Sequence, residues 1–201
     1  MKSKTWKNYL FEGALIVFSV MLALFLNQIV ENINTSRDKE KAISHITAEL
    51  QRNLEIVEEW AVIHNRMKSR TDSIINGQNA ELRNQLLDES ILNLGVLTGG
   101  ESIVNSSLSN TAWETAKATR IINEFEFETV ELLTGVYSLQ ELVFNNTIMK
   151  LTDTFFERET HDPELLEGTL LQLQLRFTEL VGQETVLIEA YRDAIRQLSS
   201  Q

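Results

Sequence analysis

The chain has 201 residues, 43% of them hydrophobic and 23% charged, which is the composition of one ordinary folded domain or of a smaller one with an appendage. One proline and eight glycines are too few for the turns of an all-β sandwich or barrel, and the lack of cysteine excludes disulfides, zinc–thiolate sites, iron–sulfur clusters and cysteine nucleophiles. The net charge of -11 argues against nucleic-acid binding, because affinity for phosphates needs clustered lysine and arginine.

The first predicted element is a membrane-spanning helix over residues 9–30, with the sequence YLFEGALIVFSVMLALFLNQIV. From Gly13 to Leu26 it holds nothing more polar than Ser19, and a helix of this length crosses a hydrocarbon core of about 30 Å. A cleaved signal peptide and a buried helix of a soluble protein are the alternatives. We favour an uncleaved anchor because the apolar run ends in Asn27 and Gln28, without the small residues of a signal-peptidase site.

Charge divides unevenly at the end of this segment. Residues 1–30 carry three lysines and one acid, a net charge of +2, whereas the remaining residues carry 15 basic and 28 acidic side chains, a net charge of -13. Basic residues next to a span favour the cytoplasmic side, and the lysines of this tip are Lys2, Lys4 and Lys7. An equal number of basic residues lies farther away on the other side, at Arg37, Lys39 and Lys41.

This charge pattern predicts an N-terminus in the cytoplasm and an acidic domain on the opposite side of the membrane. In a Gram-negative bacterium, the protein would sit in the inner membrane with its domain in the periplasm. The predicted domains are a basic cytoplasmic tip, a transmembrane helix and an acidic extramembrane helical bundle, at residues 1–8, 9–30 and 31–201.

One face of the predicted span gathers polar and small side chains, while the opposite side is bulky and aliphatic. Small residues let helix backbones approach closely, and polar ones form hydrogen bonds across helices. We therefore expect a contact with a membrane helix, either of a second copy or of another membrane protein. Glu12 has a second interpretation, in which its carboxylate lies at the depth of the lipid headgroups, near the N-terminal lysines. The predicted contact face consists of Glu12, Ile16, Ser19, Ala23 and Asn27.

The remainder of the chain predicts an all-α fold. Neither glycine nor proline occurs between Gly13 and Gly77, and an amphipathic stripe with a polar opening turn follows alternating steps of four and three. The stripe consists of Ile29, Ile33, Ser36, Glu40, Ile43, Thr47, Leu50, Leu54, Val57, Ala61 and His64. The membrane helix is therefore expected to continue into the domain and to end at Gly77, and the poor helix formers at 32–36 are the place where a bend is expected if the helix has one.

Later helices are predicted from their periodicity and their end signals. A short helix within residues 79–94 precedes a glycine-rich loop at 95–100, and Thr111 and Glu114 stand at capping-box spacing before another helix. Three long and one or two short helices predict an antiparallel bundle. The other long helices are expected at about 126–157 and from Asp162-Pro163 to Leu198, the last one with a regular heptad that only Glu184 interrupts.

The sequence predicts no catalytic, cofactor-binding or metal-binding site. His45, His64 and His161 lack metal-ligand spacing, and His64 is more typical of a hydrogen-bonded histidine in a core or an interface. Trp113, with alanines beside it, is expected to fill a core, and the alternative is that Trp113 and Tyr137 form the wall of a binding pocket.

Two stretches carry a resemblance. The first runs from Glu12-Gly13 through Asn27 to Glu31 and is followed by Ala48-Glu49-Leu50 and Asn53; the second combines NTAWETAKAT at 110–119 with Val136-Tyr137-Ser138-Leu139-Gln140. Together they resemble uncharacterised bacterial single-span membrane proteins with a helical extramembrane domain. This chain differs in having Glu-Gly instead of Gly-Glu, and in having bulky residues instead of a second glycine in the span. The resemblance implies an architecture and a bacterial origin, and no activity.

These observations predict a non-enzymatic, membrane-anchored protein that acts by protein–protein association, as a scaffold, an accessory subunit or a self-assembling bundle. The alternative is a periplasmic ligand-sensing domain, which would signal through a partner because no second apolar run of membrane length follows Val30. A less favoured alternative is an enzyme whose site combines scattered carboxylates with His64. The bilayer and a second copy or another membrane protein are the expected partners, and no small-molecule ligand is predicted.

Overall fold

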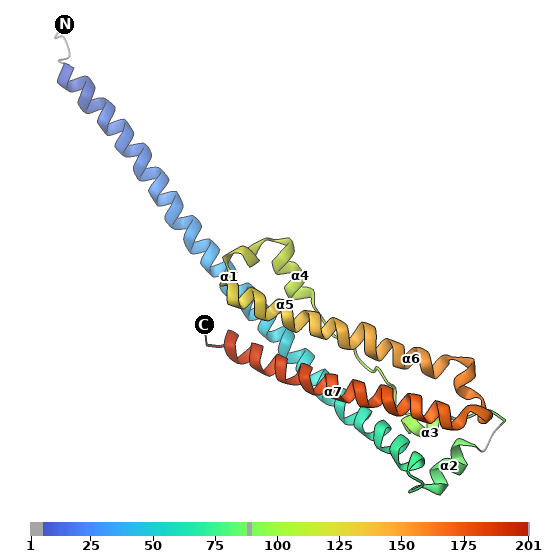
Figure 1. The fold of residues 1–201 in the computed structure, drawn as a ribbon. Helices are drawn as coiled ribbons and strands as arrows, with labels where there is room; N and C mark the ends of the chain where they lie inside the picture. The colour runs from blue at the N-terminus through green and yellow to red at the C-terminus, as the bar shows by residue number, and fades with distance from the viewer. Residues whose placement is uncertain (1–5, 88–89, 201) are drawn as a thin grey trace.

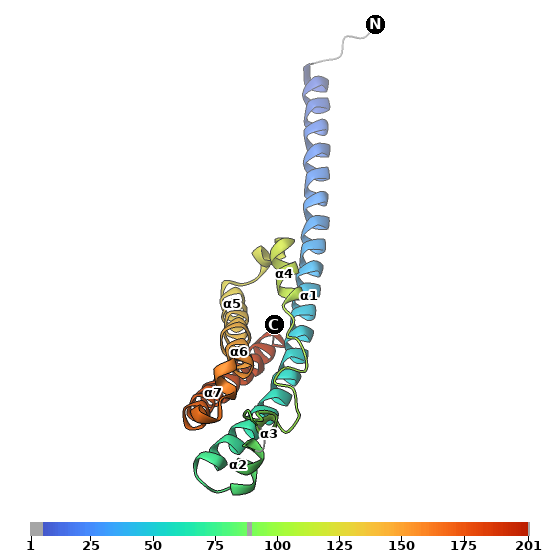
Figure 2. The ribbon, with the colours of Figure 1, turned by 90° about the vertical axis from the view of Figure 1, so that its right-hand side faces the viewer.

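The computed structural model describes residues 6–87 and 90–200, and 84% of the chain is helical (Figure 1). Within these described residues there is no strand, so the predicted all-α fold is confirmed. One very long N-terminal helix leads into a bundle that it builds together with two other long helical segments (Figures 1 and 2).

The long helix α1 spans Trp6–Ile75, which is 70 residues or about 105 Å. It passes through residues 32–36 without a break, so the poor helix formers there do not end it. Its N-terminal part stands free of the bundle, and the apolar side chains from Leu10 to Val30 are exposed (Figure 2). The helix ends where expected, because Gly77 has a φ of 66°, a left-handed conformation that glycine adopts without strain.

The core lies mainly between α1 and α7 (Leu166–Leu198), which pack along most of the length of α7. All the α7 positions of the predicted heptad are buried, including Glu184. On α1 the buried face is rotated from the predicted one. The predicted stripe begins in the apolar N-terminal segment, where Ile29 and Ile33 are exposed. The buried α1 side chains at steps of four and three are Ile46, Leu50, Asn53, Val57, Trp60, His64, Met67, Thr71 and Ile74.

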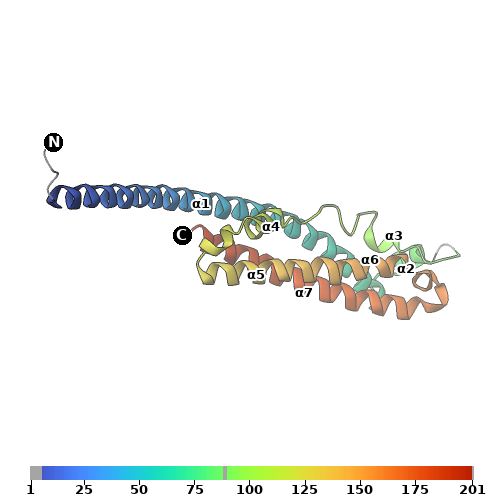
Figure 3. The same ribbon diagram turned by 90° about the horizontal axis from the view of Figure 1, so that it is seen from above.

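The third long segment is a continuous rod with a widened middle. It consists of α5 (Phe127–Glu141), the π-helical η2 (Leu142–Ile148) and α6 (Met149–Phe156), which matches the predicted helix at 126–157. The rod runs beside α7 (Figure 3) and buries Leu133, Ile148 and other apolar residues against it.

Short elements connect the long ones. They are α2 (Ala80–Leu86), α3 (Gly95–Thr98), α4 (Thr111–Ala118) and the 3₁₀ turns η1 (Ile121–Glu124), η3 (Arg158–His161) and η4 (Pro163–Leu165). Between α3 and α4, residues 99–110 have no helix and are tied to α1 by side-chain hydrogen bonds; we call this segment the strap (Figure 1).

Three local expectations need correction. The predicted loop at 95–100 contains a helical turn, Gly95–Thr98, before its two left-handed glycines. The capping box is absent: α4 begins at Thr111 behind Asn110, which makes no side-chain capping bond. Asp162 does act as an N-cap and accepts from the N–H of Glu164, but it caps η4, a 3₁₀ turn that precedes α7.

Candidate functional site

The side chain of Asn53 on α1 binds one residue of the strap, Ser109. Asn53 is almost fully buried, donates from Nδ2 to the Ser109 carbonyl at 2.6 Å and accepts the Ser109 N–H at Oδ1 at 2.9 Å. It thus satisfies both backbone polar groups of a residue that lies outside any helix. This double contact sets the position of the strap along α1.

Glu49, one turn before Asn53, is 1% exposed and accepts three hydrogen bonds. The donors are the Tyr137 hydroxyl at 2.7 Å, the Ser109 hydroxyl at 2.6 Å and the N–H of Ala112 at 2.9 Å. Because Ala112 lies in the first turn of α4, Glu49 satisfies a free N–H at the start of that helix, where a negative charge is favourable. Glu49 therefore supplies the capping contact that the local sequence of α4 does not.

Gln140 and Tyr191 extend these contacts to the other two long segments. The Gln140 Oε1 accepts from Asn53 Nδ2 at 3.0 Å and from the Tyr191 hydroxyl at 2.7 Å, and its Nε2 donates to the Ser109 carbonyl at 3.3 Å. Burial raises the pKa of Tyr191, and burial followed by the contact with Glu49 raises the pKa of Tyr137. Both phenols thus stay protonated and act as donors. One buried network joins α1, the α5 segment, α7 and the strap.

A second set of contacts lies farther along the strap, away from the free end of α1. Trp60 Nε1 donates to Asn105 Oδ1 at 2.8 Å, and Asn105 Nδ2 donates to Glu59 at 2.8 Å. His64 Nε2 lies 2.8 Å from the carbonyl oxygen of Ile103. Side chains of α1 thus contact the strap repeatedly between its residues 103 and 109.

His64 also forms a buried pair with Glu184 of α7. Nδ1 lies 2.6 Å from Glu184 Oε1, and both side chains are fully buried. With a carbonyl on one side of the ring and a carboxyl group on the other, the pair needs a shared proton between Nδ1 and Oε1, on either partner. Burial raises the pKa of Glu184, an effect that the contact with His64 partly offsets. His64 therefore occupies the core of the bundle.

Trp113 and Tyr137 pack against each other between α4 and α5. Their rings are parallel within 1°, with centroids 5.6 Å apart, and they are 4% and 7% exposed. They form part of the wall of a hollow of about 450 Å³ whose lining is largely polar. Lys117 Nζ lies 5.5 Å from the centroid of the Trp113 ring. The pair fills space between two helices and leaves little aromatic surface for a ligand.

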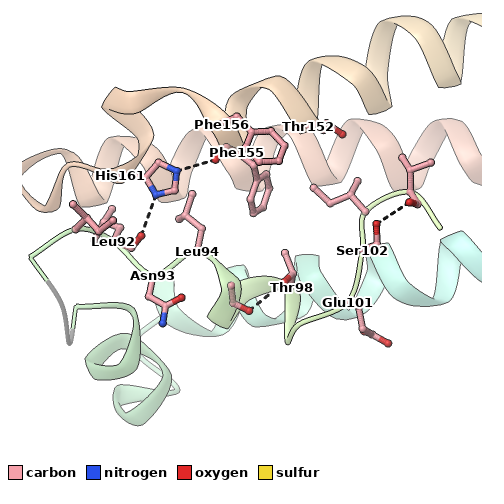
Figure 4. Close-up of a pocket in the computed structure, with 14 residues that line it drawn as sticks. Leu92, Asn93, Leu94, Thr98, Glu101, Ser102, Thr152, Phe155, Phe156 and His161 are labelled. Atoms are coloured by element: carbon pink, nitrogen blue, oxygen red, sulfur yellow. Dashed lines mark hydrogen bonds between the residues drawn. The ribbon is translucent and has the colours of Figure 1, made fainter.

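An apolar pocket lies between α3 and the end of α6 (Figure 4). These elements are at the end of the bundle far from the free part of α1 (Figure 1). The pocket has a volume of about 550 Å³ between the turn that carries Leu92 and Leu94, the strap, and the end of α6 with Phe155 and Phe156. His161 closes one end, with its ring nitrogens 3.2 and 2.9 Å from the carbonyl oxygens of Leu92 and Phe155. We call it the distal pocket.

The predicted membrane contact face lies apart from all of these sites. Glu12, Ile16, Ser19, Ala23 and Asn27 are exposed on the free part of α1, and no part of the described bundle covers them. The Ser19 hydroxyl donates to the carbonyl of Leu15 at 2.8 Å, as polar residues in apolar helices commonly do. Lys2 and Lys4 of the predicted basic tip lie outside the described residues.

The structure adds site residues that sequence reasoning missed, namely Glu49, Asn53, Ser109, Gln140 and Tyr191. The sequence offers one sign of this network: Glu49 and Asn53 are polar residues four apart among the apolar residues of α1. Residues quoted above for the bacterial resemblance meet in this network or pack beside it, since Glu49 bonds Tyr137, Asn53 bonds Gln140, and Trp113 stacks on Tyr137. Among the described residues, no cluster of three or more histidine, aspartate and glutamate side chains has the arrangement of a metal site.

Comparison of the chain with protein-family models, with curated proteins and with solved structures gives no match. The function must therefore be argued from the fold and the sites themselves.

The first prediction concerns the strap. Replacing Asn53 by alanine leaves the N–H of Ser109 without its partner and leaves the Ser109 carbonyl with only the 3.3 Å contact to Gln140, so Asn53→Ala should lower the free energy of unfolding by about 3 kcal/mol. Chemical denaturation measures the loss. The control is Asn65→Ala on the exposed side of the same helix, where a change within about 0.5 kcal/mol is expected. Equal effects at both positions would show that the strap contact contributes nothing specific.

The second prediction concerns the buried pair. Because the pKa of Glu184 is raised in the folded state, its contribution to stability is fully present below pH 4.5, the ordinary value, and is lost as the pH rises through the raised one. The stability of the wild type should therefore fall relative to Glu184→Gln as the pH increases from 4.5. Denaturation at a series of pH values measures this difference, with the exposed Glu179→Gln on the same helix as control. A difference that grows with pH would contradict the assignment.

Proposed function

We propose that this chain is a single-pass membrane protein that acts by binding another protein, with α1 as a rigid link between the membrane and the bundle. The observation that carries the proposal is the continuity of α1: one helix is mostly apolar and exposed on all sides from Leu10 to Val30, and it forms the centre of a folded core from Ile46 to Ile74. Exposure of the apolar segment from Leu10 to Val30 would be costly in water, whereas a lipid bilayer makes it favourable.

The buried network supports a role without catalysis. Glu49 accepts three hydrogen bonds, and Asn53, Gln140 and Tyr191 are bonded to one another or to the strap. These groups are buried and occupied by one another, whereas a catalytic group must reach a substrate. Their arrangement serves to hold the strap and the three long helical segments in one relative position.

Association is proposed to occur through the membrane contact face. Ser19 and Ala23 are small, so they allow another helix to come close, and Asn27 brings an amide to the same face. A rigid α1 would pass any movement of a helix bound there directly to the bundle, since no flexible linker intervenes between residues 30 and 46. Such a link suits an accessory subunit or a self-associating scaffold.

For the topology we propose a cytoplasmic N-terminus and a bundle on the other side of a bacterial inner membrane, in the periplasm. Its support is the lysine-rich start of the chain together with the acidic composition of the bundle. An acidic bundle is also repelled by anionic headgroups, which favours a position away from the membrane surface.

The third prediction tests the association. A photoreactive amino acid in place of Ala23, on the contact face, should form protein adducts in cell membranes, and the same amino acid in place of Met21, on the opposite face, should form few. Gel mobility of the tagged chain measures the adducts: doubled mass indicates a second copy, and another mass indicates a different protein. Ser19→Leu should reduce the adduct by steric exclusion. No protein adduct at position 23, or equal adducts at both positions, would contradict the proposal.

A further inference from the structure

The distal pocket has the features of a small-molecule site, beyond the association proposed above. Its volume of about 550 Å³ falls within the range of roughly 300–1,000 Å³ that is usual for ligand pockets. Three separate parts of the chain build it: the turn before and within α3, the strap, and the end of α6 with His161 behind it (Figure 4). An open pocket that several elements border is held in shape by the fold itself.

The polar side chains of the lining are mostly engaged with the protein. Ser102 donates to the Val104 carbonyl at 2.7 Å, Thr98 to the Gly95 carbonyl at 3.1 Å, and Thr152 to the Ile148 carbonyl at 3.0 Å. Of the remaining polar residues, His161 lies between two carbonyls, Glu101 binds Arg66 at 2.8 Å, and Asn93 is exposed. An occupant thus meets mainly hydrocarbon and few free polar groups.

Part of the apolar lining is exposed to solvent. Phe156 is 82% exposed and Ile91 is 52% exposed, while Phe155 beside them is buried. The two phenylalanines lie on the α6 side of the pocket, opposite Leu94 (Figure 4). A bound apolar molecule would remove these side chains from water, which is favourable by about 25 cal/mol for each Å² that it covers.

The charge of the lining limits the ligand further. Glu101 is the one carboxylate among the lining residues that the structure describes, and none of them is a lysine or an arginine. An anionic ligand would find no lysine or arginine in the lining, and the nearby Arg66 is already paired with Glu101. A neutral ligand needs no such cation, and an aromatic one can pack against Phe155 and Phe156.

We propose that the distal pocket binds a neutral aromatic small molecule. The ligand lies between Phe156 and Ile91 on the exposed side and Leu94 and Ile103 on the inner side. Ile103 is also the residue whose carbonyl binds His64, so the inner wall of the pocket is attached to the His64–Glu184 pair in the core. The proposal does not depend on what the membrane helix binds.

The test uses the full chain in lipid nanodiscs with isoleucine methyl groups labelled for NMR, and indole as the probe. Signals of Ile91 and Ile103 should shift and saturate, while that of Ile46, remote in the core, stays unchanged. Signals of Ile16 and Ile29 on the free part of α1 report separately on indole dissolved in the lipid.

Two matched comparisons make the test specific. Phe156→Ala should weaken binding about tenfold through lost apolar contact, whereas Phe127→Ala, which removes an equally exposed phenylalanine far from the pocket, should not alter it. Indole-3-carboxylate should bind about tenfold or more weakly than indole, since the lining offers it no cation. Absence of saturable shifts, an equal effect of both phenylalanine variants, or tighter binding of the carboxylate would overturn the proposal.

Discussion

The rest of the structure depends on the packing of α1 against α7, because α1 is at once the apolar N-terminal helix and the central helix of the bundle. The burial pattern changes along this single element. From Leu10 to Val30 most side chains are apolar and all are exposed, and from Ile46 on one face is buried at steps of four and three while the other stays polar. A helix whose second half is held by a core cannot turn independently in its first half, so the orientation of the apolar N-terminal segment is tied to that of the bundle.

Polar side chains within the buried face give this packing its register. Apolar helix faces tolerate sliding and rotation, whereas a buried group such as Glu49, Asn53 or His64 is satisfied in one arrangement and costly in others. Each of the three contacts the strap, and His64 also reaches α7. Because the strap has no regular secondary structure, side chains of α1 supply hydrogen bonds to its backbone groups. Buried polar contacts here serve specificity of arrangement more than net stability.

Parts of the fold that depend on local pattern were predictable from the sequence. The buried face of α7 follows from its heptad, and the end of α1 follows from Gly77. The stripe that starts at Ile29 predicts a face of α1 that is rotated from the buried one. Near Ile29 no face of the helix is buried in the bundle, so the spacing of apolar residues there carries no information about the buried face. Leu50, Val57 and His64 belong to both stripes, whereas Ile46, Asn53, Trp60 and Met67 were missed.

The buried network and the distal pocket were beyond sequence reasoning for a different reason. Glu49 and Tyr137 are 88 positions apart, and His64 and Glu184 are 120 apart, so their contacts arise only from the packing of distant segments. Glu184 was visible as an interruption of a heptad, but its partner was not. The capping of α4 by Glu49 likewise replaces the local capping box that the spacing of Thr111 and Glu114 predicted.

The central claim, that the apolar N-terminal segment and the bundle share one unbroken helix, is tested most directly by a distance across their junction. The chain has no cysteine, so spin labels at Leu26→Cys and Ser44→Cys would be the only ones present. These exposed positions are five helical turns apart, which corresponds to about 27 Å between backbones. In nanodiscs, pulsed electron paramagnetic resonance should give one narrow distribution, matching that of a reference pair with the same spacing inside the bundle, Gln51→Cys and Ser69→Cys. A broad distribution, or one markedly shorter than the reference, would contradict the continuous helix.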